Sequence, residues 1–148
     1  MSEEYRKIKN FEEYYEVSNL GNVRSIDRYV KHEEGGMRLL RGKQLKGHTN
    51  KKTGYTSVVL YKDSKGYTYL VHRLVASAFP EICGEMFDNC EIDHINTNRN
   101  DNNVLNLKVC SRKENHLNPI TRINYKKCAE HFKNQIPWNK GKKFPEKS

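Results

Sequence analysis

The sequence predicts an α+β protein made of small antiparallel sheets and a few short helices. Runs of β-branched and aromatic residues alternate with turn-forming Gly, Asn and Asp, which is typical of hairpins. Helices are indicated at two places: residues 71–79 have apolar side chains at helical spacing, and Ser111 opens a capping box. Hydrophobic residues make up 35% of the 148 residues, so we expect small cores and long polar surfaces.

The N-terminal half is expected to be entirely β. Short strands are predicted at residues 15–17 and 23–26, and the turn between them contains Gly21, which can adopt positive φ. Residues 29–54 predict an extended hairpin or loop with basic side chains facing outward. Residues 55–61 and 67–71 predict the clearest strand pair, with Gly66 in the tight position of its turn.

A short amphipathic helix is expected over residues 71–79, and Pro80 should stop it. His72 lies beside Arg73 at the start of this helix. A histidine in that position is more often structural than catalytic, so we interpret His72 as a packing residue. Residues 81–90 are expected to form a loop.

The residues most suggestive of chemistry follow this loop. Residues 91–95 read Glu-Ile-Asp-His-Ile and predict a strand, which an Asn- and Asp-rich loop separates from a second strand near 104–109. Ser111-Arg112-Lys113-Glu114 then fits the capping box of a helix, and Asn115 would lie in its first turns. The expected order is therefore strand, loop, strand, helix.

This unit carries residues suited to metal-assisted chemistry. Asp93 and Asn115 offer oxygen, the donor that Mg²⁺ prefers, and water or substrate phosphate can occupy the remaining positions. His94 can act as a general base near neutral pH. Neighbours on a regular strand point to opposite faces, so Asp93 and His94 share one site only if the strand ends, twists or bulges there. Taken alone, an Asp-His pair beside an Asn-rich turn is more often structural.

Several stretches, in order and spacing, resemble the HNH endonucleases with the ββα-metal (His-Me) finger, and in particular their phage homing branch. These stretches are VHRLVASAF, EIDHIN, NNVLNL and SRKEN. The resemblance implies that Asp93 and Asn115 are metal ligands, that His94 activates water, and that Asn106 orients the loop between the strands. His116 directly follows Asn115 and is the alternative ligand, although the dipeptide Glu114-Asn115 favours Asn115.

The pattern Y-x-V-S-N-x-G-x-V-R-S at residues 15–25 resembles a small nuclease-associated module that precedes HNH domains. Together the two resemblances imply three segments. Residues 1–50 would form the DNA-binding β module, residues 51–118 the HNH nuclease core, and residues 119–148 a basic DNA-binding tail. The tail is equally consistent with a disordered end.

The charge distribution fits double-stranded DNA as the partner. Residues 38–80 carry nine basic and one acidic residue, whereas residues 81–118 carry four and seven. A cation site between basic surfaces suits a polyanion, although basic loops also serve solubility. The candidate phosphate contacts are Arg24, Arg38, Arg41, Lys43, Lys46, Lys51, Lys52, Arg73, Lys140, Lys142 and Lys143.

We expect Mg²⁺ as the cofactor, with Mn²⁺ as a substitute and no small-molecule cofactor. The four cysteines form no C-x-x-C pair, so reduced thiols are expected rather than a structural zinc site. The longest apolar runs fall well short of the roughly 20 residues that span a membrane, and the N-terminus lacks a secretory signal. We therefore predict a cytoplasmic protein, and the resemblance implies a bacterial or phage-infected host cell. A monomer or weak dimer is expected.

The predicted function is metal-dependent hydrolysis of DNA phosphodiester bonds, which the resemblance implies would leave 5′-phosphate and 3′-hydroxyl ends. One alternative is a catalytically silent HNH-fold protein that binds DNA as a regulator. Such a protein would not need to keep Asp93, His94 and Asn115 together. A zinc-stabilised nucleic-acid adaptor is the second alternative, and it would require stoichiometric zinc.

Overall fold

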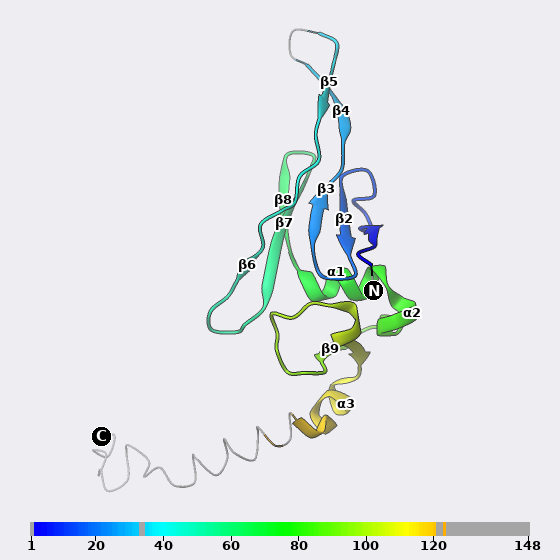
Figure 1. Cartoon of the computed structure of the whole chain (residues 1–148), viewed down its shortest axis with the longest axis vertical. Coiled ribbons are helices and arrows are strands. Elements are labelled where there is room, and N and C mark those ends of the chain that lie inside the picture. The colour runs from blue at the N-terminus through cyan, green and yellow to red at the C-terminus, as the bar shows by residue number, and fades with distance from the viewer. Residues whose placement is uncertain (1, 33–34, 121–122, 124–148) are drawn as a thin grey trace, which may run out of the picture.

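The computed structural model describes residues 2–32, 35–120 and 123. Figure 1 shows slender antiparallel sheets standing above the helix α1 (Val71–Ala78), with the strand β9 (Glu91–His94) and the helix α3 (Arg112–Leu117) below it. Short antiparallel sheets and short helices together confirm the α+β prediction.

The first sheet has the order β1-β2-β3 (Tyr5–Lys7, Tyr15–Ser18 and Val23–Ser25) and is antiparallel throughout. Both strands predicted here are confirmed. The turn between them is held by the Ser18 hydroxyl, which accepts hydrogen bonds from the backbone N–H groups of Leu20 and Asn22. Gly21 has a φ of +87°, as its place in the turn predicted.

A hairpin formed by β4 (Arg28–Lys31) and β5 (Met37–Leu40) projects from the end of this sheet in Figure 1. The third sheet contains β6 (His48–Thr49), β7 (Thr56–Lys62) and β8 (Lys65–Leu70), in that order. The predicted extended hairpin and the predicted strand pair are both confirmed.

The expected role of Gly66 was wrong. The β7–β8 turn has positive φ at Asp63 and Ser64, 51° and 60°, which suits the right-handed twist of a two-residue hairpin. Gly66 instead lies in β8 opposite Tyr61. A Cβ at Gly66 would lie 3.1 Å from a ring carbon of Tyr61, so glycine leaves room for that ring.

α1 ends at Ala78, as predicted from Pro80, but the segment that follows is not simply a loop. Pro80 starts the short helix α2 (Pro80–Cys83), where its missing N–H costs nothing.

The second strand of the site region also starts later than predicted. Residues Val104–Asn106 form a 3-10 turn before β10 (Leu107–Cys110), because the Asn103 side chain accepts a hydrogen bond from the Leu105 N–H and tightens the chain there.

One hydrophobic core joins the two halves of the chain. It contains Phe11 and Val17 from the N-terminal segment together with Leu60, Val75 and Val104 from the rest. The Tyr15 hydroxyl accepts a hydrogen bond from the Tyr61 N–H at 3.1 Å. This shared core contains residues from both sides of the predicted boundary between residues 50 and 51. The division of the chain at that boundary stays a prediction.

Polar contacts reinforce the same junction. The Arg6 guanidinium donates to the Ala78 carbonyl at 3.0 Å, pairs with Glu81 at 2.7 Å and stacks on Phe79.

Cys83, Cys90 and Cys110 are buried free thiols. Cys128 and almost all of the predicted tail lie outside the described residues.

Candidate active site

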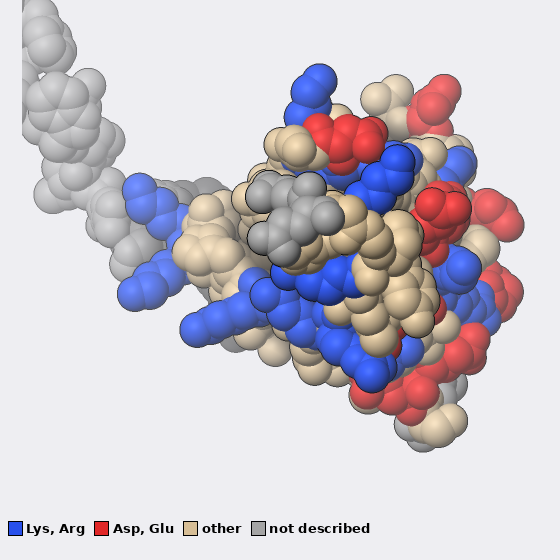
Figure 2. Space-filling view, turned by 90° about the horizontal axis from the view of Figure 1, so that it is seen from above, with Lys and Arg blue, Asp and Glu red and all other residues tan. Residues whose placement is uncertain are grey.

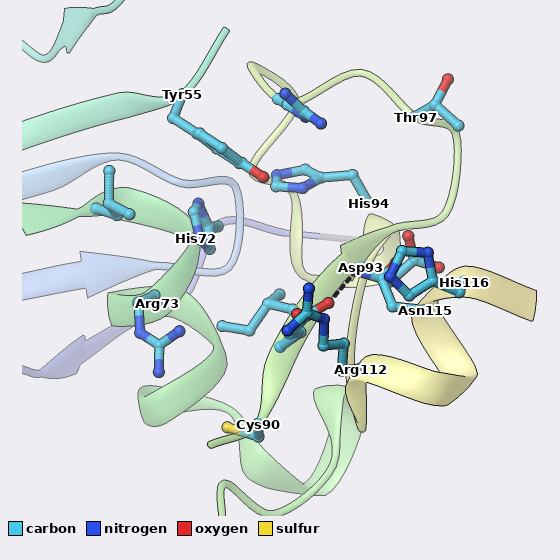
Figure 3. A pocket seen from close by; sticks show the side chains of 14 residues that line it. Tyr55, His72, Arg73, Cys90, Asp93, His94, Thr97, Arg112, Asn115 and His116 are labelled. Carbon is cyan, nitrogen blue, oxygen red and sulfur yellow. Dashed lines mark hydrogen bonds between the residues drawn. The ribbon is translucent and has the colours of Figure 1, made fainter. Parts of the chain in front are cut away.

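A pocket of about 780 Å³ opens where α1, β9 and α3 meet. Asp93, His94 and Asn115 all line it, together with His72 and Arg112 (Figure 3). The structure therefore gathers the three residues predicted to carry the chemistry. It also adds Tyr55, Glu91 and Arg99, which sequence reasoning did not assign to the site.

Asp93 and His94 reach one pocket because β9 ends at His94. In the β9–β10 ladder Asp93 is opposite Lys108 and His94 is opposite Leu107. Directly after the strand, the His94 carbonyl accepts a hydrogen bond from the Thr97 N–H at 2.7 Å, and the chain turns away. The predicted condition for a shared site, that the strand ends at this point, is met.

The His94 imidazole is almost fully enclosed, with 4% of the residue exposed. Its Nε2 lies 3.5 Å from Asn102 Oδ1, and its ring packs edge-on against His72 with 5.1 Å between centroids. Burial lowers the pKa of His94, and the hydrogen bond to Asn102 and the charge of Asp93 oppose that shift. The ring is consequently neutral near pH 7, the form that a general base requires.

His72 forms the inner wall of the pocket. Its ring lies between Tyr55, 5.0 Å away, and His94, and 5% of the residue is exposed. Burial, followed by the nearby His94 and Arg73, lowers the pKa of His72 to about 4. Its Nδ1 has no hydrogen-bond partner among the described residues. These contacts agree with the packing role predicted for His72, although they place it beside the candidate base.

Asp93 and Asn115 supply the oxygen donors of the pocket. Asp93 is half-buried, and its Oδ2 accepts a hydrogen bond from the Asn118 amide at 2.6 Å. The Asn115 amide nitrogen donates a hydrogen bond to Glu91 Oε2 at 2.7 Å. The amide oxygen is therefore the Asn115 atom that is available to a cation. The capping box predicted at Ser111 and Glu114 is confirmed, and it fixes the start of the helix that carries Asn115.

This donor set fits a hard divalent cation. Asp93 and Asn115 offer one carboxylate and one amide oxygen, which suit an ion that keeps water and binds phosphate. In the part of the chain that the structure describes, no three His, Cys, Asp or Glu side chains converge as a metal cluster. His116 also lines the pocket, so both sequence-predicted alternatives, Asn115 and His116, lie at the site.

Asn106 holds the loop that separates the two strands. It is 8% exposed, and its Oδ1 accepts a hydrogen bond from the Asn96 N–H at 2.9 Å. Its amide nitrogen donates to the Asp101 carbonyl at 2.8 Å. Both bonds tie Asn106 to loop residues, which is the geometry expected for a residue that orients the loop.

All candidate phosphate contacts among the described residues are exposed, and two of them also pair with an acidic side chain. Arg24 pairs with Glu16 at 2.8 Å and stacks on Tyr5, and Arg41 pairs with Asp27 at 2.9 Å. Arg73 is exposed and lines the pocket. The further exposed candidates are Arg38, Lys43, Lys46, Lys51 and Lys52.

Figure 2 shows basic side chains gathered across one part of the surface, with acidic ones concentrated toward another edge. The three remaining candidates, Lys140, Lys142 and Lys143, lie outside the described residues.

Comparison with known proteins identifies the family of the chain. Residues 3–61 match the family profile described as the NUMOD4 motif, and residues 69–117 match the profile described as HNH endonuclease. The DNA endonuclease I-HmuI of Bacillus phage SP01 is 36% identical over 138 residues, which cover 90% of this chain and 70% of that protein.

The chain belongs to the HNH endonucleases.

A solved structure described as DNA binding and cleavage by the HNH homing endonuclease I-HmuI superposes on this HNH endonuclease with a TM-score of 0.64 and 33% identity. The match covers 89% of this chain and 68% of that one. The prediction of a homing-type HNH endonuclease is thereby confirmed. Among the described residues, none of the helices of this HNH endonuclease is both long and apolar enough to cross a membrane.

Proposed function

We propose that this HNH endonuclease hydrolyses phosphodiester bonds of double-stranded DNA with Mg²⁺, for which Mn²⁺ can substitute. The observation that supports this most directly is the convergence of Asp93, His94 and Asn115 on one pocket. The likeness to a phage DNA endonuclease supports DNA as the substrate.

Within the pocket, Asp93 and Asn115 would hold the cation through their oxygens, and Glu91 orients Asn115 through its amide nitrogen. When bound, the ion supplies Lewis-acid stabilisation of the charge that develops on the phosphate and on the departing 3′ oxygen. Neutral His94 takes a proton from the attacking water. Arg73 and Arg112 line the same pocket and offer positive charge to the phosphate groups on either side of the cleaved bond.

Asn106 contributes by holding the loop after His94, and the exposed basic residues from Arg38 to Lys52 contribute by binding the DNA backbone. We further propose that the protein acts as a monomer or weak dimer in the cytoplasm of a bacterial or phage-infected cell. A monomer with a single site would nick one strand, whereas a dimer would cut both.

Incubation of the protein with supercoiled plasmid and Mg²⁺ tests this proposal. Open-circular product is the result expected of a monomer, and linear product is expected of a dimer. A silent DNA-binding regulator would retard the plasmid in a gel without converting it, and that result would overturn the catalytic proposal.

A further inference from the structure

Asn102 is the polar side chain that the structure places against the ring nitrogen of His94. Asn102 is 7% exposed, and its Oδ1 lies 3.5 Å from His94 Nε2. The Asn102 amide nitrogen donates to the Asn100 carbonyl at 3.2 Å. If the amide were flipped, Asn102 Oδ1 would lie against the Asn100 carbonyl oxygen, and two acceptors would face each other. Oδ1 therefore faces His94.

This orientation selects one form of the imidazole. A carboxamide oxygen only accepts hydrogen bonds, so the Nε2 facing it carries the proton of the neutral ring. Nδ1 then keeps the lone pair with which a base takes a proton from water. Asn102 therefore acts on His94 in the way that a hydrogen-bonded neighbour sets the tautomer of many functional histidines.

The position of Asn102 is set by the Ser18–Asn22 turn of the first sheet, which is far away in the sequence. A Cβ at Gly21 would lie 2.8 Å from Asn102 Cβ and 3.1 Å from the Asn102 carbonyl oxygen. Two residues on, the Val104 N–H donates to the Asn19 carbonyl at 2.8 Å. Backbone and side chain of the loop thus lie directly on the turn.

The turn is itself firmly held. Asn19 is 2% exposed, and its side chain accepts a hydrogen bond from the Glu4 N–H and donates to the Ser2 carbonyl, both at 3.0 Å. The Ser18 hydroxyl accepts two backbone N–H groups within the same turn. The turn belongs to the segment that matches the NUMOD4 motif, whereas Asn102 and His94 belong to the segment that matches the HNH family.

We infer that the Ser18–Asn22 turn is a positioning element of the active site: it seats Asn102, and Asn102 fixes the orientation and tautomer of His94. The inference rests on the proposed function, in which His94 is the general base. According to this inference, the N-terminal segment contributes to the rate of cleavage, in addition to any contribution to DNA binding. Asn102 and Gly21 are positioning residues, since both act through another residue.

The first test measures the tautomer of His94 without any need for cleavage. Long-range ¹H–¹⁵N NMR spectra of the full chain near neutral pH report which ring nitrogen carries the proton. The unsubstituted protein should show the Nε2–H form, and Asn102→Ala should show a mixture of both forms. An Nδ1–H form in the unsubstituted protein, or an unchanged spectrum in Asn102→Ala, would overturn the inference.

The second test measures single-turnover plasmid cleavage. Asn102→Ala should slow cleavage about 10- to 100-fold, the usual effect of removing a partner that orients a functional residue, while the DNA dissociation constant changes less than about twofold. Asn103→Ala is the matched control, since Asn103 caps the neighbouring 3-10 turn through Leu105. It should lower the melting temperature and leave the His94 tautomer and the cleavage rate unchanged.

A double-mutant cycle separates positioning from general stabilisation. In a His94→Ala background, Asn102→Ala should change the residual rate by less than about twofold, because its partner is gone. A full further loss in that background would show that Asn102 acts elsewhere and would overturn the inference. Absence of cleavage by the unsubstituted protein, with the NMR result as expected, would instead count against the proposed function alone.

Gly21→Ala tests the contact with the turn. It should slow cleavage and mix the His94 tautomers much as Asn102→Ala does. Gly36→Ala is matched to it, because Gly36 also has a positive φ, +89°, but has nothing within 4 Å of an added Cβ. If the two glycine variants cleave DNA equally well, the turn does not position the site.

Discussion

The active-site region, residues 91–118, and the basic segment, residues 38–52, present their polar side chains in opposite ways. In the active-site region Asn102, Asn106 and Asn115 are each bound to other residues by their side-chain amides. In the basic segment Lys43 and Lys46 lie exposed between β5 and β6, and Lys51 and Lys52 lie exposed in the turn that precedes β7. The difference teaches that the proposed chemistry requires a geometry shared among neighbouring residues, whereas the proposed attraction of DNA requires only exposed charges that act one by one.

Removal of the metal should have the largest effect on DNA cleavage. EDTA should abolish cleavage, and Mg²⁺ or Mn²⁺ should restore it. Asp93→Ala and Asn115→Ala should each be severely impaired, and the double variant should lose less than the sum of the two because both hold one ion. His116→Ala is the control and should stay active. If His116→Ala were inactive and Asn115→Ala were active, the metal ligand would be His116 rather than Asn115.

The loss of the general base should come next. His94→Ala should slow cleavage by about 10² to 10⁴, the usual contribution of a positioned base. Binding of the same DNA should be nearly unchanged, because His94 is buried and offers little contact surface. Single-turnover cleavage and a gel-shift titration measure the two quantities. Full cleavage activity in this variant would remove His94 from the mechanism.

The buried imidazole of His72 links stability to pH in the active-site region. Its pKa is lowered to about 4 in the folded protein, whereas the unfolded chain regains the ordinary value of 6.5. The unfolded state therefore binds more protons between these values, and the free energy of unfolding falls as pH drops from about 7 toward 4, by about 2 to 3 kcal/mol from this group.

Urea unfolding of His72→Phe across this pH range tests that link. The phenyl ring preserves the stacking on Tyr55 and cannot titrate, so the variant should lose less stability than the parent as pH falls. Above about pH 7 the pH dependence of the two proteins should match. Parallel curves over the whole range would show that His72 does not carry the effect.

The smallest effects should come from single charges of the basic segment. Lys51→Ala/Lys52→Ala should make the slope of log K against log salt shallower by about 1 to 2, since each phosphate contact contributes about 0.9. Lys7→Ala/Lys9→Ala removes the same charge from the first sheet region and is the matched control. Equal changes in the two variants would mean that net charge, rather than the basic segment, attracts the DNA.

The sequence by itself determined the parts of this protein that depend on near neighbours. The strand at Glu91–His94, the capping box at Ser111 and the turn at Gly21 were predictable because each depends on side chains within a few positions. Two local predictions were nevertheless wrong: the Asn103 cap places a 3-10 turn where a strand was expected, and Asp63 and Ser64, rather than Gly66, form the tight part of the β7–β8 turn.

Only the tertiary structure decided how distant residues meet. It put His72 and Tyr55 against His94, paired Arg24 with Glu16 and Arg41 with Asp27, and pressed Gly21 against Asn102. No spacing rule encodes such contacts, because they follow from how separate sheets and helices bury one common core. The amino-acid sequence specified which side chains could do the proposed chemistry, and the packing of that core decided which of them lie against His94.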